Sequence, residues 1–306
     1  MRAPGWRWAR THPLTSVFFV ALAVRLVNLA LLDGDRAFFA EPDAVGYWAL
    51  GKALTAPGGF ATTLLAMTDR MPLYPLLLAA VQSALGDAPR AVAFIQALID
   101  AGTCTLIASL GAFVTARVGL IAGILAALSP TLIVFSTQIL TDTLFLFFMT
   151  LMLVAAASFA LRPGNGPALL AGLAGGLALV TRPAVAVLLA AGAPLVFALA
   201  INGRRRLAGA LASTLLFALG AAAPIAPVLL RNAVHYGSVS LTTETAEHLA
   251  FWIVPLVKQR ADGTPYQASI DWMESRYRQR RIARGLDAGS NPFERAALKS
   301  EVAREA

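Results

Sequence analysis

Two carboxylates, Glu41 and Asp43, stand two residues apart in a polar stretch that also holds Tyr47. A carboxylate beside an aromatic ring is suited to act as a general base toward a hydroxyl or an amine, or to bind a metal ion or sugar hydroxyls. A simpler interpretation is that Pro42 and Asp43 cap a helix over 44–54. The spacing alone leaves both interpretations open.

Three more charged residues could belong to the same site. Asp142 follows one apolar segment and begins the next, where it could also cap a helix together with Thr141. Arg70 and Arg182 are cations at the ends of apolar segments. A guanidinium there can bind a phosphate through two parallel hydrogen bonds, or simply extend toward the membrane surface. Acidic residues at membrane depth are usually functional, which favours a role for Asp142.

These candidates fall on one side of a membrane if the apolar segments cross it in alternation. Before position 232, the acidic residues between the apolar segments and at their flanks then share one face: Asp33, Asp35, Glu41, Asp43, Asp69, Asp87 and Asp142. The other face carries arginines: Arg2, Arg7, Arg10, Arg117, Arg162, Arg204, Arg205 and Arg206. Because Lys and Arg are enriched on the cytoplasmic side, we expect a cytoplasmic N-terminus and chemistry on the outer face.

The composition agrees with a membrane protein. Of the 306 residues, 58% are hydrophobic and only 14% are charged, whereas soluble domains are about a quarter charged. The net charge of +8 could indicate nucleic acid, but the basic residues stand at span ends and in the C-terminal tail, which favours anionic lipid. The single cysteine, Cys104, excludes a disulfide within the chain. The sequence has no metal-ligand cluster, phosphate loop, triad pattern or nucleic-acid motif.

About 20 apolar residues are needed to cross the membrane core as a helix. We predict an all-α polytopic bundle with about seven spans, at 14–32, 91–115, 118–136, 141–161, 167–181, 183–201 and 207–230. The segment 72–86 would reach only about 22 Å. We therefore expect an interfacial or re-entrant helix there, with a tilted eighth span as the alternative.

The spans divide the chain into two parts. Residues 1–230 would form a transmembrane module, whose outer loop 33–90 carries the candidate acids. Residues 231–306 are polar, with helical patterns near 268–286 and 292–304, and would lie outside the cytoplasm.

Two features inside the spans indicate how the helices pack. Arg25 and Asp100 are charges in the middle of spans, so both should face the bundle interior and could pair with each other. Gly172 and Gly176 are small residues four apart, a spacing typical of close helix packing.

Several short motifs occur in a recognisable order: EPDAVGYWALGKAL after the first span, then RMPLYP, SPTLIVFSTQILTDTLF, LVTRP, and RNAVHYGSVSLTT after the last span. In this order they resemble the polytopic glycosyltransferases of the GT-C fold. The nearest likeness is to bacterial relatives of the protein O-mannosyltransferases and the lipid A aminoarabinose transferases, similar to glycosyltransferase family 39. The resemblance runs from about residue 14 to the end of the chain.

The resemblance implies that a sugar is transferred, with inversion, from a polyprenyl-phosphate donor to an acceptor on the extracytoplasmic face of a bacterial inner membrane. Asp43 would be the catalytic base and Asp142 the second acidic group of the cavity. Arg70 would lie near the donor phosphate. The other residues expected to bind substrate are Glu41, Tyr47, Tyr74, Arg182, Arg231 and Asn232.

The sequence departs from the family pattern at two positions. Ala44 replaces a second acid that often follows the loop aspartate, so we expect no cofactor and consider a divalent metal doubtful. Glu247 and His248 replace a Gly-Asn pair, which could alter acceptor contacts. Relatives continue into further spans, so the resemblance implies an N-terminal fragment with an incomplete 231–306 segment. Two alternatives stay open: a transporter or flippase of lipid-linked substrates, and an inactive truncated transferase.

Overall fold

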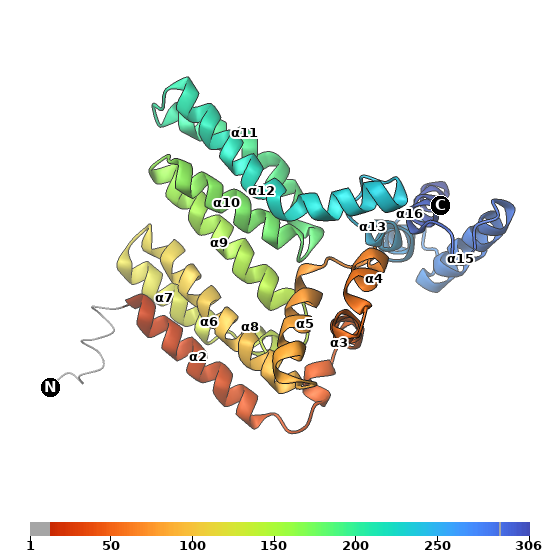
Figure 1. Cartoon of the computed structure of the whole chain (residues 1–306), viewed down its shortest axis with the longest axis horizontal. Helices are drawn as coiled ribbons and strands as arrows, with labels where there is room; N and C mark the ends of the chain where they lie inside the picture. The colour runs from red at the N-terminus through yellow and green to blue at the C-terminus, as the bar shows by residue number, and fades with distance from the viewer. Residues whose placement is uncertain (1–12, 288) are drawn as a thin grey trace. The chain divides into compact units, whose positions relative to one another are not determined.

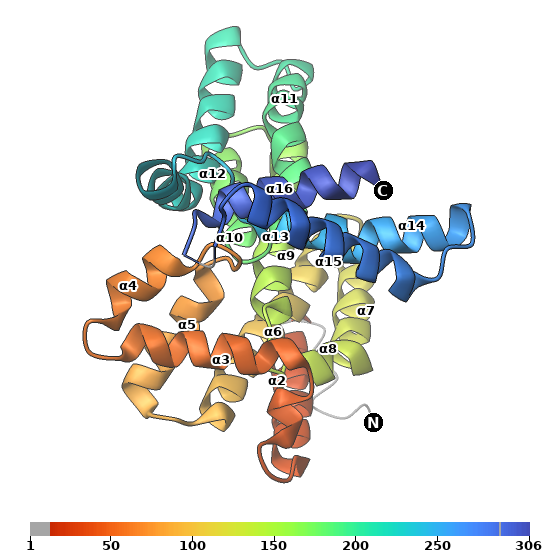
Figure 2. The ribbon, with the colours of Figure 1, turned by 90° about the vertical axis from the view of Figure 1, so that its right-hand side faces the viewer.

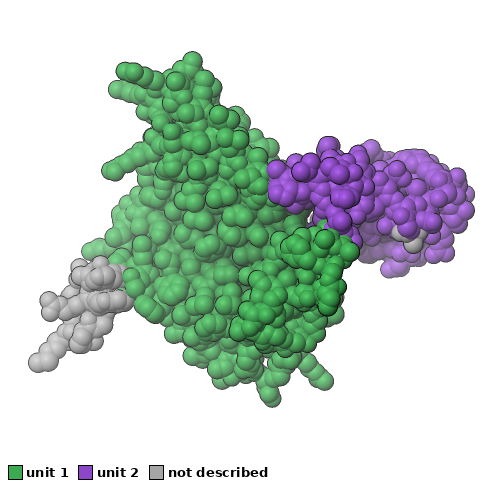
Figure 3. Space-filling model, in the orientation of Figure 1, with its two compact units in different colours: residues 1–64, 71–225 green, residues 65–70, 226–306 purple. Residues whose placement is uncertain are grey.

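The computed structural model of the chain describes residues 13–287 and 289–306. The described part is helical and has no strand. The chain forms two compact units, shown in different colours in Figure 3. Unit 1 consists of residues 1–64 and 71–225, and unit 2 of residues 65–70 and 226–306.

Unit 1 is a bundle of antiparallel helices (Figure 1). Its long elements are α2 (Pro13–Leu31), α6 (Pro89–Ala112), α7 (Ala116–Ala127), α9 (Asp142–Leu161), α10 (Asn165–Leu179), α11 (Ala186–Asn202) and the first part of α12 (Leu207–Tyr236). Short connections at 113–115, 162–164 and 203–206 join successive helices. Such short connections hold sequential helices side by side in opposite directions.

Among the described residues, five helices are long and apolar enough to cross a membrane: Pro13–Leu31, Pro89–Ala112, Asp142–Leu161, Leu207–Tyr236 and the stretch Pro183–Asn202. This confirms the all-α polytopic bundle. Three apolar helices are shorter, namely α5 (Leu73–Leu85), α7 and α10. The 15 residues of α10 reach about 22 Å, so the predicted span at 167–181 is short for a level crossing.

The continuous span predicted at 118–136 was wrong. The chain forms α7, then breaks at Leu128 and Ser129, and resumes as α8 (Pro130–Phe135). Proline has no N–H to donate to the carbonyl four residues earlier, and its ring collides with that carbonyl. The break therefore falls directly before Pro130.

The segment between α2 and α6 does not follow the bundle direction. It forms η1 (Arg36–Phe39), α3 (Pro42–Thr55), α4 (Gly59–Ala66) and α5. Helix α3 is seen end-on in Figure 1 and lengthwise in Figure 2, so it runs across the bundle helices, and α5 packs against it. At 13 residues, α5 agrees with the interfacial or re-entrant helix expected at 72–86.

The acidic residues of unit 1 gather at one end, which also holds Arg36, Lys52, Arg90 and Arg182, whereas the described residues at the other end include arginines and no Asp or Glu. The connections at 113–115, 162–164 and 203–206 lie at one end of the bundle (Figure 1), and Arg117, Arg162 and Arg204–206 lie in or beside them. The other end carries the segment 32–88 and the start of α9, with Asp33, Asp35, Glu41, Asp43, Asp87 and Asp142. This is the expected separation of charge. Arg2, Arg7 and Arg10 lie outside the described residues, and Asp69 belongs to unit 2.

Arg25 and Asp100 form the ion pair that the sequence indicated, and both are buried. Arg25 Nε donates to the Asp100 carboxylate. Its Nη1 donates to the carbonyl of Ala21 at 3.1 Å and to that of Ala127 at 2.9 Å, and its Nη2 donates to Cys104 Sγ at 3.3 Å. One guanidinium thus joins α2, α6 and the last turn of α7.

The predicted close packing at Gly172 and Gly176 is confirmed. A Cβ atom at Gly172 would lie 2.0 Å from the Phe217 carbonyl oxygen, and one at Gly176 would lie 2.4 Å from that of Ala221. A larger residue at either of these two positions would therefore push α12 away from α10.

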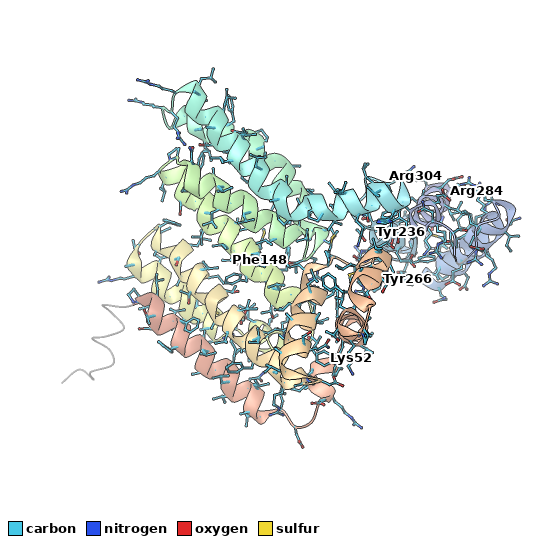
Figure 4. All side chains as sticks on the ribbon, in the orientation of Figure 1. Lys52, Phe148, Tyr236, Tyr266, Arg284 and Arg304 are labelled. Atoms are coloured by element: carbon cyan, nitrogen blue, oxygen red, sulfur yellow. The ribbon has the colours of Figure 1, made fainter. Side chains whose placement is uncertain are left out.

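Unit 2 is a smaller helical cluster built from α13 (Glu244–His248), the π-helix η3 (Leu249–Ile253), α14 (Val254–Ala261), α15 (Tyr266–Ala283) and α16 (Pro292–Glu305). Ala250, Met273 and Ala303 form its small core. Arg280 and Arg284 of α15 pair with Glu301 of α16 at 2.5 and 3.0 Å; Arg284 and Tyr266 are labelled in Figure 4. Helices α15 and α16 confirm the patterns predicted near 268–286 and 292–304.

The buried ion pair makes a testable prediction about stability. Arg25→Met or Asp100→Leu alone should lower the free energy of unfolding by about 3–5 kcal/mol, because each leaves a buried charge without its partner. The double variant should be more stable than either single variant. Unfolding of purified protein in detergent measures this, and Lys52→Met in the exposed Lys52–Asp87 pair is the control, expected to change little. Simple additivity of the two single losses would contradict the pairing.

Candidate functional site

An apolar cluster at the acidic end of unit 1 joins the elements that carry the candidate acids. Its members come from α3, α5, α6, the loop before α9 and the start of α9: Ala44, Tyr47, Trp48, Tyr74, Leu78, Val81, Val92, Ala93, Ile139, Leu140 and Leu144, together with Leu29 and Phe38. Ala44 follows Asp43 directly, and Leu144 is two residues after Asp142. Burial of one cluster therefore holds the first turns of α3 and α9 at the same end of the bundle.

Asp43 lies in the first turn of α3, where it is exposed. The N-cap position belongs to Glu41, Pro42 is the first helical residue, and Asp43 follows it. Asp43 is thus not the cap residue that the simpler interpretation required. A carboxylate in the first turn is stabilised by the partial positive charge of the helix N-terminus.

Asp142 is paired with Arg182. Arg182 Nη1 donates to Asp142 Oδ1 at 2.6 Å, and both side chains are partly exposed. Asp142 is the first residue of α9 and Thr141 holds the N-cap position, so the expected capping role of Asp142 is replaced by an ion pair. Asp142 and Arg182, which are 40 positions apart and were predicted as separate site residues, therefore form one ion pair.

A second contact ties the Arg182 turn to α5. The backbone N–H of Leu73 donates to the carbonyl of Val180 at 3.1 Å. These two bonds link the start of α5, the turn after α10 and the start of α9.

Tyr74 follows Leu73 directly at the start of α5. Its ring packs edge-on against that of Tyr47, with 5.3 Å between ring centroids. The Tyr74 side chain is fully buried and its hydroxyl donates to Gln96 Oε1 at 2.6 Å. Because the Tyr74 side chain is fully buried and its hydroxyl is bonded to Gln96, the observed geometry makes Tyr74 a support of the site. Substrate binding by Tyr47 and Tyr74 stays a prediction.

Gln96 is a buried residue that the sequence reasoning missed. Its Nε2 donates to the carbonyls of Ser136 at 3.1 Å and Gln138 at 2.7 Å. The next residue along, Ile139, donates its N–H to the carbonyl of Phe38 at 3.0 Å. These bonds hold the loop before Asp142 against α5, α6 and η1. A lone amide among apolar residues, four positions before Asp100, was the available signal.

A polar cluster at the other end of α5 joins α3 to the loop before α6. Lys52 Nζ donates to Asp87 Oδ2 at 2.6 Å, and Trp48 Nε1 donates to Asp87 Oδ1 at 3.1 Å; Lys52 is labelled in Figure 4. The bond from Lys52, with a smaller contribution from Trp48, lowers the pKa of the Asp87 carboxyl. The pair therefore contributes stability above the usual carboxyl pKa, and loses it as pH falls through the lowered value.

The remaining predicted residues, Arg70, Arg231 and Asn232, belong to unit 2. Asn232 is fully buried: its Oδ1 accepts from Arg231 Nε at 2.8 Å, and its Nδ2 donates to the carbonyl of Ser240 at 2.7 Å. Asn232 thus orients Arg231 and closes the turn that follows α12.

The same turn holds the short segment that ends in Arg70. Tyr236 donates its hydroxyl to the carbonyl of Leu65 at 2.8 Å, and the N–H of Thr243 donates to that of Thr68 at 2.9 Å. Within unit 2, Arg70 and Arg231 therefore stand on segments that are bonded to each other.

Metal ligands do not gather in the described part of the chain. Among residues 13–287 and 289–306, no group of three or more His, Cys, Asp or Glu side chains is arranged to hold a metal ion. At the position where a second acid was expected, Ala44 is completely buried in the apolar cluster.

The Gln96 network makes a testable prediction. Gln96→Leu should destabilise the protein more than Tyr74→Phe. Replacing Gln96 leaves three buried groups without their hydrogen-bond partner, namely the Tyr74 hydroxyl and the carbonyls of Ser136 and Gln138. Replacing Tyr74 leaves one such group, the Gln96 side-chain oxygen. Each buried polar group left unpaired costs about 1–3 kcal/mol. Thermal unfolding in detergent compares the two variants, and an equal or smaller loss for Gln96→Leu would contradict the network.

The chain was compared with known proteins. The family model described as dolichyl-phosphate-mannose-protein mannosyltransferase matches residues 69–230. The match includes Arg70, Asp142 and Arg182, but begins after Asp43 and ends before Arg231. No curated protein and no solved structure matches the chain. The family match covers more than half of the 306 residues, and the chain therefore belongs to this family of membrane glycosyltransferases.

Proposed function

We propose that this chain transfers a sugar from a polyprenyl-phosphate donor to an acceptor, with inversion, and that Asp43 is the base. The observation that carries the proposal is the shared apolar cluster, which holds Asp43 and the Asp142–Arg182 pair at the acidic end of unit 1. A base and a cation held at one membrane surface suit a reaction in which a hydroxyl loses a proton while a phosphate leaves.

The chemical step follows from these groups. Asp43 accepts the proton of the acceptor hydroxyl as its oxygen attacks the anomeric carbon of the sugar. The bond from that carbon to the phosphate oxygen breaks on the opposite face, and the polyprenyl phosphate leaves with the electron pair. Attack opposite to the leaving group inverts the anomeric configuration. Asp43 returns its proton to water after the product leaves.

The other predicted residues have supporting roles in this proposal. Arg182, oriented by Asp142, keeps further N–H donors that can bind sugar or phosphate oxygens. Arg70 and Arg231 are the candidates for the lipid phosphate, since a guanidinium matches two phosphate oxygens at once. Glu41 and Tyr47 would bind sugar hydroxyls. No step is assigned to a cofactor or a metal ion.

Asp43→Asn tests the base. Asn keeps the size of the side chain but loses the basic oxygen, so transfer from a polyprenyl-phosphate sugar should fall by about 10²-fold or more. Folded yield should change little, since Asp43 is exposed and Asn keeps the shape and an accepting oxygen of its side chain. Glu41→Gln is the matched control, expected to be milder. Normal turnover in Asp43→Asn would remove Asp43 from the mechanism.

The membrane orientation is part of the proposal. We infer a bacterial inner-membrane protein with its N-terminus in the cytoplasm and its acidic end outside, because the arginines gather at the opposite end of unit 1. Residues 231–306 would then lie on the extracytoplasmic side.

Cysteine labelling in intact cells tests this orientation. Gly46→Cys suits the outer side, since a Cβ there meets open space. Asn202→Cys suits the inner side, because Asn202 is exposed at the end of α11, whereas a Cβ at Gly203 would lie 2.6 Å from Pro163. An impermeant reagent should label position 46 and spare position 202. The reverse pattern would overturn the orientation.

A further inference from the structure

The segment 249–261 of unit 2 is apolar on two opposite sides. One side packs into the core of unit 2, where Ala250 and Pro255 are buried and Leu249, Phe251 and Val254 contact the core residues. Figure 2 shows α14 beside α15, against which it packs. This side accounts for the folding of the segment onto unit 2.

The other side is exposed. Trp252 is 62% exposed, Ile253 52%, Leu256 47% and Val257 57%. Their spacing of i, i+1, i+4 and i+5 places them together on one helical face, which we call the 252–257 face. A helix that is hydrophobic all round is normally covered on every side. In the described chain, the 252–257 face is the uncovered half of such a helix.

Polar groups at the border of this face indicate what covers it. Arg260 is exposed and lies four residues after Leu256, so it continues the same face by one turn. The ring of His248 stands edge-on to Trp252, with 6.3 Å between ring centroids. Tryptophan prefers the boundary between lipid tails and headgroups, and a cation at the border of an apolar helical face is placed to meet lipid phosphates.

We propose that the 252–257 face inserts into the headgroup boundary of the bilayer and anchors unit 2 to the lipid surface. The chain is a membrane protein, and Trp252 follows the end of the spanning helix α12 by 16 residues (252 minus 236), so the bilayer surface is within reach of the chain. Four partly exposed side chains are far fewer than the roughly 20–30 residues that each partner contributes to a stable protein interface. This favours lipid over a second copy of the chain.

The anchor has a consequence for the donor. Unit 2 carries Arg70 and Arg231, and the phosphate of a membrane lipid lies at headgroup level. An anchor on unit 2 would therefore keep the unit that carries both guanidinium groups at the membrane surface. The lipid contact itself stands whether or not the proposed chemistry is correct.

Single-cysteine variants of the full chain in lipid nanodiscs test the anchor. Cysteines replace Ile253 or Val257 on a Cys104→Ser background, and each carries an environment-sensitive fluorophore. Ile282→Cys is the matched control, because Ile282 is 69% exposed on α15 among arginines. Lipids with a nitroxide near the headgroup should quench positions 253 and 257 severalfold more than position 282. Adding Trp252→Ser and Leu256→Ser should abolish the difference.

Two results would overturn the anchor. Equal quenching and equal water exposure at all three positions would show that the 252–257 face has no lipid contact. Shielding at 253 and 257 that is insensitive to the nitroxide lipids, and that disappears in nanodiscs holding one protein molecule, would assign the face to a second copy. Both readouts are independent of transfer activity, so they separate failure of the anchor from failure of the proposed reaction.

Discussion

A positive charge buried inside a membrane bundle is the constraint on which unit 1 depends. In hydrocarbon no water can solvate Arg25, so its N–H groups must find acceptors within the protein. They find the Asp100 carboxylate, two backbone carbonyls and the sulfur of Cys104. The carbonyl of Ala127 lies in the last turn of α7, where helical carbonyls have no partner in the helix. Arg25 thus helps to end α7, and the loop that leads to Asp142 begins from there.

The functional groups stand at helix ends because the middle of the bundle cannot hold them. Exposed carboxylates and guanidinium groups remain solvated at the membrane surface, while Arg25 and Asp100 are the buried charged residues in the part of the chain that the structure describes. The positions of these surface groups must then be fixed by buried contacts beneath them. The apolar cluster and the hydrogen bonds of Gln96 are such contacts, since both connect α5 and α6 to the loop before α9.

Much of the bundle could be predicted because its determinants are local. Runs of apolar residues indicate the helices, and two lone charges in such runs indicate the Arg25–Asp100 pair. Hydropathy averaged over a window is insensitive to the missing N–H of Pro130, so it predicts one continuous helix over 118–136. Nor does a sequence show which distant residue a side chain meets. Asp142 was therefore weighed as a cap although it pairs with Arg182, and Gln96 was not singled out.

The burial of Ala44 limits how the start of α3 could evolve. Position 43 faces water and position 44 faces the apolar cluster, because successive helical residues are turned by about 100° from each other. A carboxylate at position 44 would be stripped of water among Tyr47, Trp48 and Tyr74, which costs several kcal/mol unless it is neutralised. Replacing Ala44 by an acidic residue would therefore not by itself give a working pair of adjacent acids at positions 43 and 44. Such a pair would require the helix to rotate or the cluster to be rebuilt around it.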